Sequence, residues 1–226
     1  GFPEKLLPSS STGEIVHHSF YTLSYNEPCE QAEWVAHVLD KSHLTYKDRK
    51  RPYFIEDPFV SSKSADWKNY KGSGYDRGHL VPAGDRRFSE NAYNETFYTS
   101  NISPQDRAFN GGIWNDLEQQ TRRWAKKYGT LYVFTGGVLK KGLKEIGEEE
   151  VDVPENFYKI IARKRGNELG VIAFMIPNAQ QVKELSTFRV SVDVVEKETG
   201  IDFFAQLPVK EQESFEKTVR RSDFEF

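Results

Sequence analysis

The sequence of 226 residues contains a single cysteine, Cys29. One thiol cannot form a disulfide within the chain, and it also excludes a zinc site built from several cysteines. Long hydrophobic runs are absent as well. No apolar segment approaches the about 18–20 residues of a membrane-spanning helix, which excludes a membrane protein. Strong charge of one sign is missing too, because 31 Lys and Arg face 34 Asp and Glu, for a formal net charge of −3. Nucleic acid could therefore be bound through a local basic cleft but not by bulk charge.

The rest of the composition is typical of a folded protein. Hydrophobic residues make up 37% of the chain and aromatic residues 14%, which is too much for a disordered polymer. The chain is long enough to bury a sizeable core, and no linker rich in Pro, Gly and Ser divides it. We therefore expect a flexible lead-in over residues 1–13 and a single domain over residues 14–226.

Periodicity and turn residues predict the elements along the chain. Helical spacing of apolar residues predicts helices over residues 30–39, 110–128 and 191–198, and a charged terminal helix is expected over 210–220. Runs rich in β-branched and aromatic residues predict strands over 15–25, 53–55, 131–135, 157–162 and 169–176. The acidic stretch over 144–155 is expected to be a solvated loop, with a docking site for an inhibitor or another partner as the alternative.

The densest group of chemically useful side chains lies in the middle of the sequence. It comprises Asp76, Arg77, His79, Asn101, Asn110, Glu118 and Arg122. Hydrolysis of a phosphodiester needs a base that deprotonates water, a cation that bears charge on the leaving oxygen, and guanidinium groups that hold the phosphate. The group contains side chains for all three tasks and therefore indicates phosphodiester cleavage.

Several of these residues also have a purely structural interpretation. His79 has an ordinary pKa of about 6.5, which suits a general base, but it could equally be a hydrogen-bonded structural histidine. Asn110 could cap the helix that follows it or supply an amide oxygen to a hard cation such as Mg²⁺. Glu118 could pair with Arg122 on a helix face. On a straight helix Asn110 and Glu118 lie about 12 Å apart along the axis, so both cannot bind one ion directly.

The other histidines predict no metal site. His17 and His18 would face opposite sides of a strand. His37 and His43 have no partner at the spacing of metal ligands.

Short motifs in the middle of the chain stand at a distinctive spacing. They are Asp76-Arg77-Gly78-His79, Asn101, Ser103-Pro104-Gln105, Asn110, Trp114 and Glu118. Together they resemble the DNA/RNA non-specific endonucleases, a family that includes bacterial extracellular nucleases and mitochondrial endonuclease G. The resemblance implies an α+β fold with a ββα-metal (His-Me finger) core and a central antiparallel sheet flanked by helices.

The resemblance also implies roles for the site residues. His79 matches the general base, and Asn110 matches the direct protein ligand of one Mg²⁺ ion, for which Mn²⁺ could substitute. Glu118 matches a carboxylate that contacts the cation through a water molecule. The reaction would leave 5′-phosphate ends.

The remaining matches concern the phosphate and the framework of the site. Asn101 matches an amide that holds the site together, and Arg77 and Arg122 match arginines close to the phosphate. The family also uses an upstream arginine, for which Arg51 is the first choice and Arg49 the second.

The implied activity is a Mg²⁺-dependent endonuclease that cleaves DNA and RNA without regard to sequence or sugar. A non-catalytic nucleic-acid-binding relative is the alternative, as is a nuclease or phosphodiesterase with a narrower choice of substrate. The expected partners are DNA and RNA, with a protein inhibitor as a further possibility and no membrane.

The N-terminus shows no charged and then apolar leader. Asn101-Ile102-Ser103 is a glycosylation sequon at the predicted site, and a glycan there would block it. We therefore expect a bacterial protein, secreted or periplasmic, from which a leader has been removed.

Overall fold

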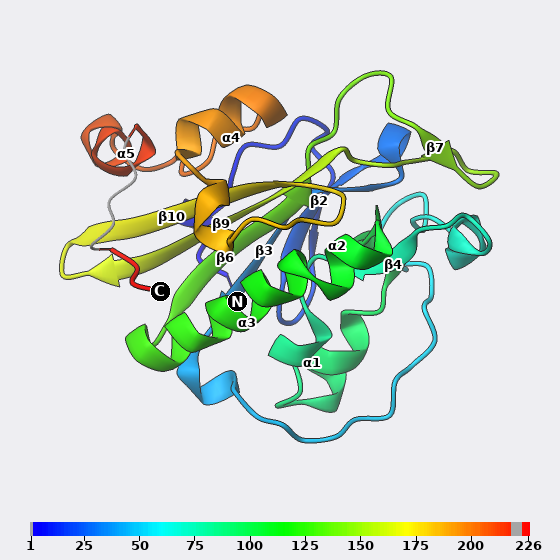
Figure 1. Ribbon diagram of the computed structural model, residues 1–226, viewed down its shortest axis with the longest axis horizontal. Helices are drawn as coiled ribbons and strands as arrows, with labels where there is room; N and C mark the ends of the chain where they lie inside the picture. The colour runs from blue at the N-terminus through cyan, green and yellow to red at the C-terminus, as the bar shows by residue number, and fades with distance from the viewer. Residues whose placement is uncertain (1, 218–222) are drawn as a thin grey trace.

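A large antiparallel sheet forms the centre of the computed structural model, which describes residues 2–217 and 223–226. Its seven strands follow the spatial order β1-β2-β3-β6-β9-β10-β11 (Figure 1). They are β1 (Ile15–His17), β2 (Thr22–Asn26), β3 (Gln31–Leu39), β6 (Leu131–Gly137), β9 (Asn156–Arg165), β10 (Glu168–Pro177) and β11 (Arg189–Val190). Each neighbouring pair is antiparallel. This sheet and its helices confirm the predicted α+β fold.

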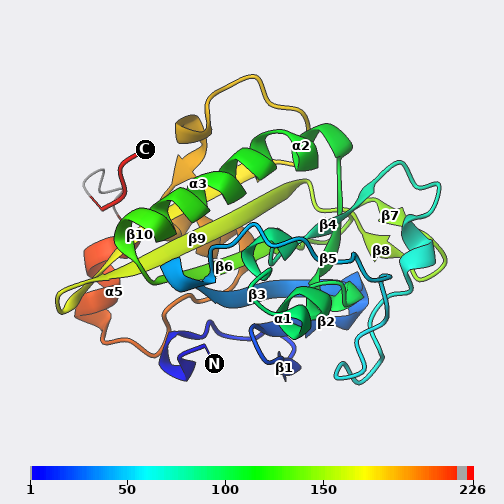
Figure 2. The same cartoon turned by 90° about the horizontal axis from the view of Figure 1, so that it is seen from below.

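Helices cover both faces of the sheet. α3 (Ile113–Tyr128) lies across one face, and α4 (Val192–Thr199) and α5 (Val209–Glu216) lie on the other (Figures 1 and 2). One hydrophobic cluster fills the space under α3, and a second fills the space under α4 and α5. A sheet whose two faces are both covered has apolar residues on both sides of its central strands.

The predicted helix over 110–128 is largely confirmed as α3. Trp114, Leu117 and Trp124 lie on one stripe of this helix and are fully or almost fully buried against the sheet. The helix ends at Gly129, whose φ of 91° is favourable only for glycine and whose N–H donates to Ala125 O at 2.8 Å. The predicted strands over 131–135, 157–162 and 169–176 and the helix over 191–198 are also confirmed, with ends moved by a few residues.

The predicted helix over 30–39 is wrong, because these residues form β3. This strand lies between β2 and β6 in the interior of the sheet. Trp34 and Ala36 belong to the hydrophobic cluster on one face, and Val35 and Leu39 belong to the cluster on the other. A strand that is buried on both faces loses the alternation of apolar and polar residues, so its apolar positions also fit a helical spacing.

A smaller unit stands beside the sheet and follows the expected order of two strands and a helix. β4 (Asp76–His79) pairs antiparallel with β5 (Ile102–Gln105), and α2 (Arg107–Gly111) follows β5 directly. The long connection between the two strands contains α1 (Glu90–Glu95). Figure 2 shows β4 and β5 at the end of the molecule where α2 begins.

The remaining elements are short. The 3-10 turns are η1 (Glu4–Leu6), η2 (Glu27–Cys29), η3 (Lys41–His43), η4 (Trp67–Tyr70), η5 (Ala83–Asp85), η6 (Thr99–Asn101) and η7 (Leu185–Phe188). The segment 15–25, predicted as a strand, forms the two paired strands of the β1–β2 hairpin. The predicted strand over 53–55 is reduced to a single bridge between Ile55 and Tyr98. The terminal helix expected over 210–220 is α5 as far as Glu216, and residues 218–220 lie outside the described residues.

The segment expected to be a lead-in packs against the sheet. Leu6 and Leu7 are buried in the cluster under α4 and α5, and Trp34 Nε1 donates to Ser9 O at 2.9 Å. The division into residues 1–13 and a single domain over 14–226 stays a prediction.

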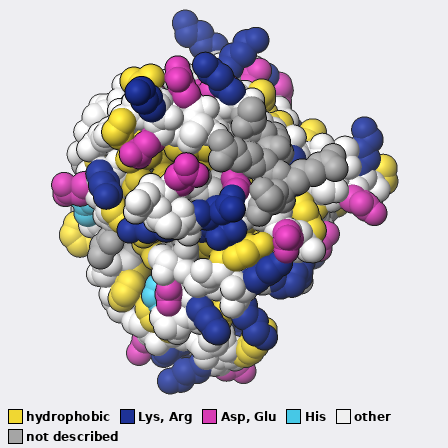
Figure 3. Space-filling view, turned by 90° about the vertical axis from the view of Figure 1, so that its left-hand side faces the viewer, with side chains coloured by type: hydrophobic (Ala, Val, Ile, Leu, Met, Phe, Trp, Pro, Cys, Tyr) yellow, Lys and Arg dark blue, Asp and Glu magenta, His cyan; other side chains and the backbone are white. Residues whose placement is uncertain are grey.

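The surface shows no strong segregation of charge on the face drawn in Figure 3. Lys and Arg side chains alternate there with Asp and Glu side chains, in keeping with the small net charge. Among the described residues, no helix has the length and apolar character needed to cross a membrane.

Candidate active site

A cavity of about 350 Å³ lies where β4, α2 and α3 approach one another. Four residues predicted from the sequence line it, namely Arg51, His79, Asn110 and Glu118. They come from a loop, a strand and two helices, and 67 positions separate the first from the last. The fold therefore gathers an imidazole, a carboxamide, a carboxylate and a guanidinium around one open space.

β4 places His79 at the wall of this cavity. Strand pairing sets Gly78 opposite Ser103, and an added Cβ at Gly78 would lie 2.1 Å from the side chain of Gln105. Only glycine allows so close an approach. The packing of the two strands thus fixes the position of the next residue, His79.

The imidazole of His79 is half-buried between aromatic rings. Its ring centroid lies 4.8 Å from that of Phe97, edge to face, and 5.7 Å from that of Phe54. Nε2 is enclosed and has no hydrogen-bond partner among the described residues. Burial and, to a smaller extent, the nearby charge of Arg51 lower the pKa of His79 to about 3. The ring is therefore neutral near pH 7 and can accept a proton.

Asn101 lies behind the cavity and is fully buried. Its Oδ1 accepts a hydrogen bond from Val81 N at 2.9 Å, and its Nδ2 donates to Val81 O and to Thr96 O at 3.1 and 3.0 Å. These bonds tie the segment that follows β4 to the end of the connection before β5. Asn101 therefore contacts the framework and leaves no polar atom for a substrate, and its sequon is shielded from solvent.

A break in the helix brings Asn110 and Glu118 to the same cavity. Gly112 ends α2 with φ −107° and ψ −112°, and α3 begins at the next residue. A Cβ at Gly112 would stand 2.4 Å from Ala108 O, so the break requires glycine. The straight-helix geometry expected from the sequence therefore does not apply. Asn110 lies in α2 and does not cap α3.

A hydrogen bond from its nitrogen orients the carboxamide of Asn110. Its Nδ2 donates to Asp76 Oδ2 at 3.0 Å, which joins α2 to the strand that carries His79. This bond occupies the amide nitrogen and leaves Oδ1 as an acceptor. Glu118 supplies carboxylate oxygens to the same cavity. Oxygen donors of these two kinds are the ligands that a hard divalent cation prefers, so the residues present fit such an ion.

A buried network of charges lies behind Glu118. Arg122 Nη2 is 3.7 Å from Glu118 Oε2, and Arg122 Nε donates to Asp85 Oδ1 at 2.7 Å. Asp85 Oδ2 in turn lies 3.0 Å from Nε2 of His37 on β3. The predicted pair of Glu118 and Arg122 is thus present, and it extends into the sheet. Burial lowers the pKa of His37 to about 4 although Asp85 acts in the opposite direction, so this histidine is neutral.

Lys159 on β9 adds a second cation to the network. It is 1% exposed, and its Nζ donates to Thr135 Oγ1 at 2.9 Å and lies 5.1 Å from the ring centre of Trp114. Burial raises the pKa of Glu118, whereas the charges of Lys159 and Arg122 lower it. The sequence interpretation missed Lys159. The signal that could have found it is a single lysine inside the apolar run from Phe157 to Ala162.

The arginines differ in their relation to the cavity. The guanidinium carbon of Arg51 lies 5.7 Å from the ring centre of Phe54, and that of Arg77 lies 5.0 Å from the same ring. Arg51 lines the cavity, whereas Arg77 is not among its lining residues. Arg49 donates from Nε to Arg87 O at 3.0 Å and does not line it either. Of the two upstream candidates, the structure therefore places Arg51 beside His79.

Arg122 faces a neighbouring cavity of about 590 Å³. This second cavity is also lined by Arg87, Arg123 and Lys126, and it shares Gly84 with the first. An added Cβ at Gly84 would lie 2.6 Å from Arg122 Nη2, so a larger residue between the two cavities would collide with the guanidinium of Arg122. Basic side chains thus continue from the cavity of His79 into this adjoining cavity, and we call the second cavity the basic groove.

The sequence interpretation also missed two other lining residues, Asn115 and Arg87. Asn115 lies one position after Trp114 and carries no motif of its own. Arg87 lines both cavities. Nothing in the local sequence distinguishes either residue from an ordinary surface side chain.

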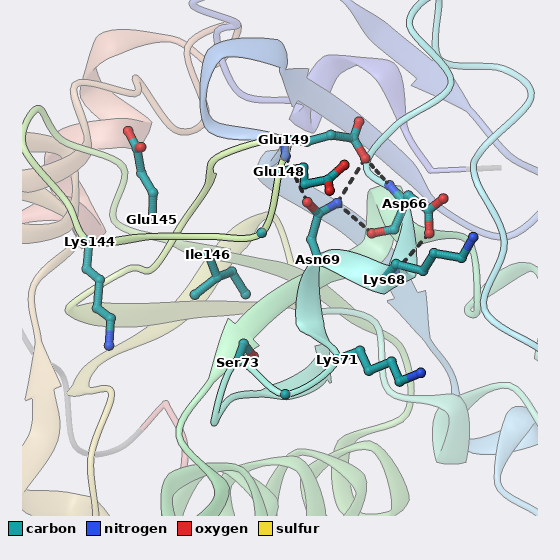
Figure 4. Close-up of a pocket in the computed structure, with 12 residues that line it drawn as sticks. Asp66, Lys68, Asn69, Lys71, Ser73, Lys144, Glu145, Ile146, Glu148 and Glu149 are labelled. Carbon is teal, nitrogen blue, oxygen red and sulfur yellow. Dashed lines mark hydrogen bonds between the residues drawn. The ribbon is translucent and has the colours of Figure 1, made fainter.

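A larger cavity of about 620 Å³ lies apart from these residues (Figure 4). Its walls are η4 and the hairpin of β7 (Glu145–Ile146) and β8 (Val151–Asp152). Figure 4 shows Asn69 and Glu149 facing each other across one wall, where Asn69 Nδ2 donates to Glu149 Oε1 at 2.9 Å. The acidic stretch expected as a solvated loop is thus a short hairpin anchored on η4. The cavity contains no histidine, and we assign the chemistry to the smaller one.

Comparison with known proteins also assigns most of the chain to a family of nucleases. The family described as DNA/RNA non-specific endonuclease matches residues 2–210. "Nuclease EXOG, mitochondrial" of Danio rerio is 38% identical over 218 residues, which cover 89% of this chain and 63% of that protein. "Endonuclease G, mitochondrial" of Caenorhabditis elegans is 36% identical over 230 residues and is covered to 75%. The chain spans about three fifths of the length of the vertebrate relatives.

A solved structure shows the same fold. It is the complex described as "Crystal structure of the EndoG/EndoGI complex: Mechanism of EndoG inhibition", with a TM-score of 0.79, 31% identity and 88% coverage of both chains.

The relatives also correct the expected location of the protein. Those of Danio rerio, Caenorhabditis elegans, Homo sapiens and Saccharomyces cerevisiae are named as mitochondrial nucleases of eukaryotes. The expectation of a secreted or periplasmic bacterial protein is therefore wrong.

Proposed function

The chain belongs to the DNA/RNA non-specific endonuclease family, and we propose that it hydrolyses phosphodiester bonds in DNA and RNA with the help of a divalent cation. One observation carries the proposal. His79, with a depressed pKa, and Asn110, with a free carboxamide oxygen, line the same open cavity. A base and a cation ligand at one cavity are the pair that hydrolysis of a phosphodiester requires.

His79 is the proposed general base. Its Nε2 is enclosed by protein, so Nδ1 is the nitrogen that takes the proton from water. A neutral ring performs this step without first losing a proton of its own, and the depressed pKa keeps it neutral across the physiological range. The approach of a phosphate, with its negative charge, would raise this pKa toward the range in which a base works best.

Asn110 is the proposed direct ligand of one Mg²⁺, with Mn²⁺ as a substitute, and Glu118 is proposed to contact the ion through water. When bound, the cation would neutralise charge on the departing 3′ oxygen, which leaves a 5′-phosphate. Asp76 fixes the amide of Asn110 by accepting its N–H, so the ligand oxygen has a defined orientation. Arg122 Nη2 forms an ion pair with Glu118 Oε2 at 3.7 Å, which restrains the carboxylate.

The arginines are proposed to hold the phosphate. Arg51 lies at the cavity beside His79, and Arg122 and Arg87 extend the basic groove. The guanidinium groups of Arg77 and Arg51 both lie over the ring of Phe54, so Arg77 can reach a phosphate at the edge of the cavity. Groups that contact the backbone and not the base edges give no sequence preference, which agrees with the family's description.

Two further parts of the proposal rest on the relatives alone. We propose a mitochondrial location, because several relatives are named so. We also propose that a protein inhibitor can bind the chain, because the solved relative is described in a complex that explains inhibition. Fractionation of cells that express the full-length protein tests the first, and cleavage assays with EndoGI added test the second.

Digestion of long DNA and RNA tests the activity. The wild-type chain should give a broad ladder of products from both substrates with Mg²⁺, and no cleavage with EDTA. His79→Ala should abolish cleavage and stay folded, whereas His17→Ala, at an exposed histidine of β1, should leave cleavage unchanged. Binding of nucleic acid without cleavage by the wild-type chain would favour the non-catalytic alternative. Cleavage at a few fixed positions would favour the narrower nuclease.

A further inference from the structure

Three carboxylates meet on the face of the sheet opposite α3. Asp193 and Glu196 lie on α4, and Glu216 lies on α5, which packs beside α4 (Figure 1). Each side chain offers one oxygen, and the three oxygens lie within 4.8 Å of one another. Asp202, in the segment after α4, is close enough for its charge to act on Glu196 and Glu216. Three carboxylates therefore meet at one small volume, and the charge of a fourth acts on two of them.

Aromatic packing holds this arrangement in place. Phe215, the residue before Glu216, is buried, and its ring centroid lies 4.9 Å from that of Phe204. Glu196 Oε2 accepts a hydrogen bond from Phe203 N at 2.8 Å. The contacts of these phenylalanines fix both helices, so the carboxylates are brought together by the core and not by chance rotation at the surface.

Glu216 is the member that lacks compensation. Its side chain is 9% exposed, and its Oε1 is enclosed without a hydrogen-bond partner in the part of the chain that the structure describes. Lys217, the next residue, forms its ion pair with Glu213 at 3.9 Å, and its charge acts on Glu216 without a direct contact. Across residues 2–217 and 223–226, no ion pair joins a Lys or Arg to the three carboxylates. An enclosed charge without a partner is strongly unfavourable, so the cluster requires a cation or bound protons.

We propose that Asp193, Glu196 and Glu216 bind a structural Ca²⁺ that joins α4 to α5. Ca²⁺ takes oxygen ligands at about 2.3–2.6 Å in flexible geometry, which suits carboxylates that come from two separate helices. Mg²⁺ requires a near-ideal octahedron at about 2.0–2.1 Å and usually keeps several of its waters, so it is less suited to such a set of protein ligands. The ligand set contains only carboxylates, which suits a hard cation. This site lies on the other face of the sheet from Asn110 and does not depend on the proposed nuclease activity.

Calcium titration of the purified chain after treatment with a chelator tests the proposal. Isothermal titration calorimetry gives the affinity, and thermal unfolding gives the stabilisation. Five proteins are compared: the wild type, Glu216→Gln, Asp193→Asn, Asn110→Ala and Glu211→Gln. Asn110→Ala removes the proposed active-site ligand, and Glu211→Gln is a matched control at an exposed glutamate of α5.

The wild type, Asn110→Ala and Glu211→Gln should all bind Ca²⁺ at this site. At ten times the dissociation constant, Tm should rise by about 3–6 °C in each. Glu216→Gln and Asp193→Asn should lose at least about tenfold in affinity, and Glu216→Gln without Ca²⁺ should be no less stable than the wild type. Equal Ca²⁺ affinity in Glu216→Gln and the wild type would overturn the proposal. So would the loss of all Ca²⁺ binding in Asn110→Ala.

Discussion

Replacing Lys159 with methionine should destabilise the protein by about 3 kcal/mol. Lys159 is almost fully buried in β9, and its positive charge acts on Glu118. Removing one member of a directly paired buried ion pair costs about 3–5 kcal/mol, because the other charge is left uncompensated, whereas Lys159 and Glu118 act on each other without a direct contact. The loss should fall at the lower end of this range, since Arg122 Nη2 remains 3.7 Å from Glu118. For a chain of this size, 1 kcal/mol changes Tm by about 2–4 °C, so Tm should fall by about 6–12 °C.

Thermal unfolding of four variants tests this reasoning. Lys159→Met and Glu118→Gln are measured singly and together, and Lys164→Met at the exposed end of the same strand is the control. If the two charges compensate each other, the double variant should lose clearly less stability than the sum of the single losses. The reasoning is refuted if the losses add, or if Lys159→Met lowers Tm no more than Lys164→Met.

Three further predictions concern the site and its framework. Burial lowers the pKa of His37 to about 4 and that of His79 to about 3, so below about pH 6.5 the unfolded chain binds protons that the native chain does not. The free energy of unfolding, measured with urea, should therefore fall as the pH drops from about 6.5 toward 4, and His37→Gln should show a shallower fall. Gly78→Ala should cost about 1–3 kcal/mol and most of the activity, because the new Cβ would lie 2.1 Å from Gln105; wild-type cleavage and Tm would contradict this. Asn101→Ala removes three hydrogen bonds to the backbone and should cost about 2–4 kcal/mol by urea unfolding, whereas a loss below 1 kcal/mol would show that these bonds are replaced.

The sequence predicted the strongly periodic parts of the fold. α3 was identifiable because one face of it is apolar and a glycine follows its last turn. β9 and β10 were identifiable because a short turn joins two runs of β-branched and aromatic residues. β3 was not, because helices cover both faces of the sheet at this strand and its apolar residues follow no single period. One face of β3 is covered by α4 and α5, which come more than 150 positions later in the chain.

The candidate site was predictable to the extent that its residues form a motif. His79, Asn110 and Glu118 stand at a recognisable spacing, and the structure places all three at one cavity. The path between Asn110 and Glu118 was not predictable, because it depends on a backbone break at Gly112 that the helical pattern hides. Lys159 stands out in its apolar strand, but its effect on Glu118 was not predictable, because it arises only when β9 packs beneath α3.

Chemical rescue tests the central claim most directly. His79→Ala leaves a space at the wall of the cavity that free imidazole can enter, so the rate of DNA and RNA cleavage at saturating Mg²⁺ is measured as imidazole is added. Cleavage by His79→Ala should be lost without imidazole and should rise with its concentration, whereas Asn110→Ala should not respond to it. Wild-type cleavage by His79→Ala in the absence of imidazole would contradict the account.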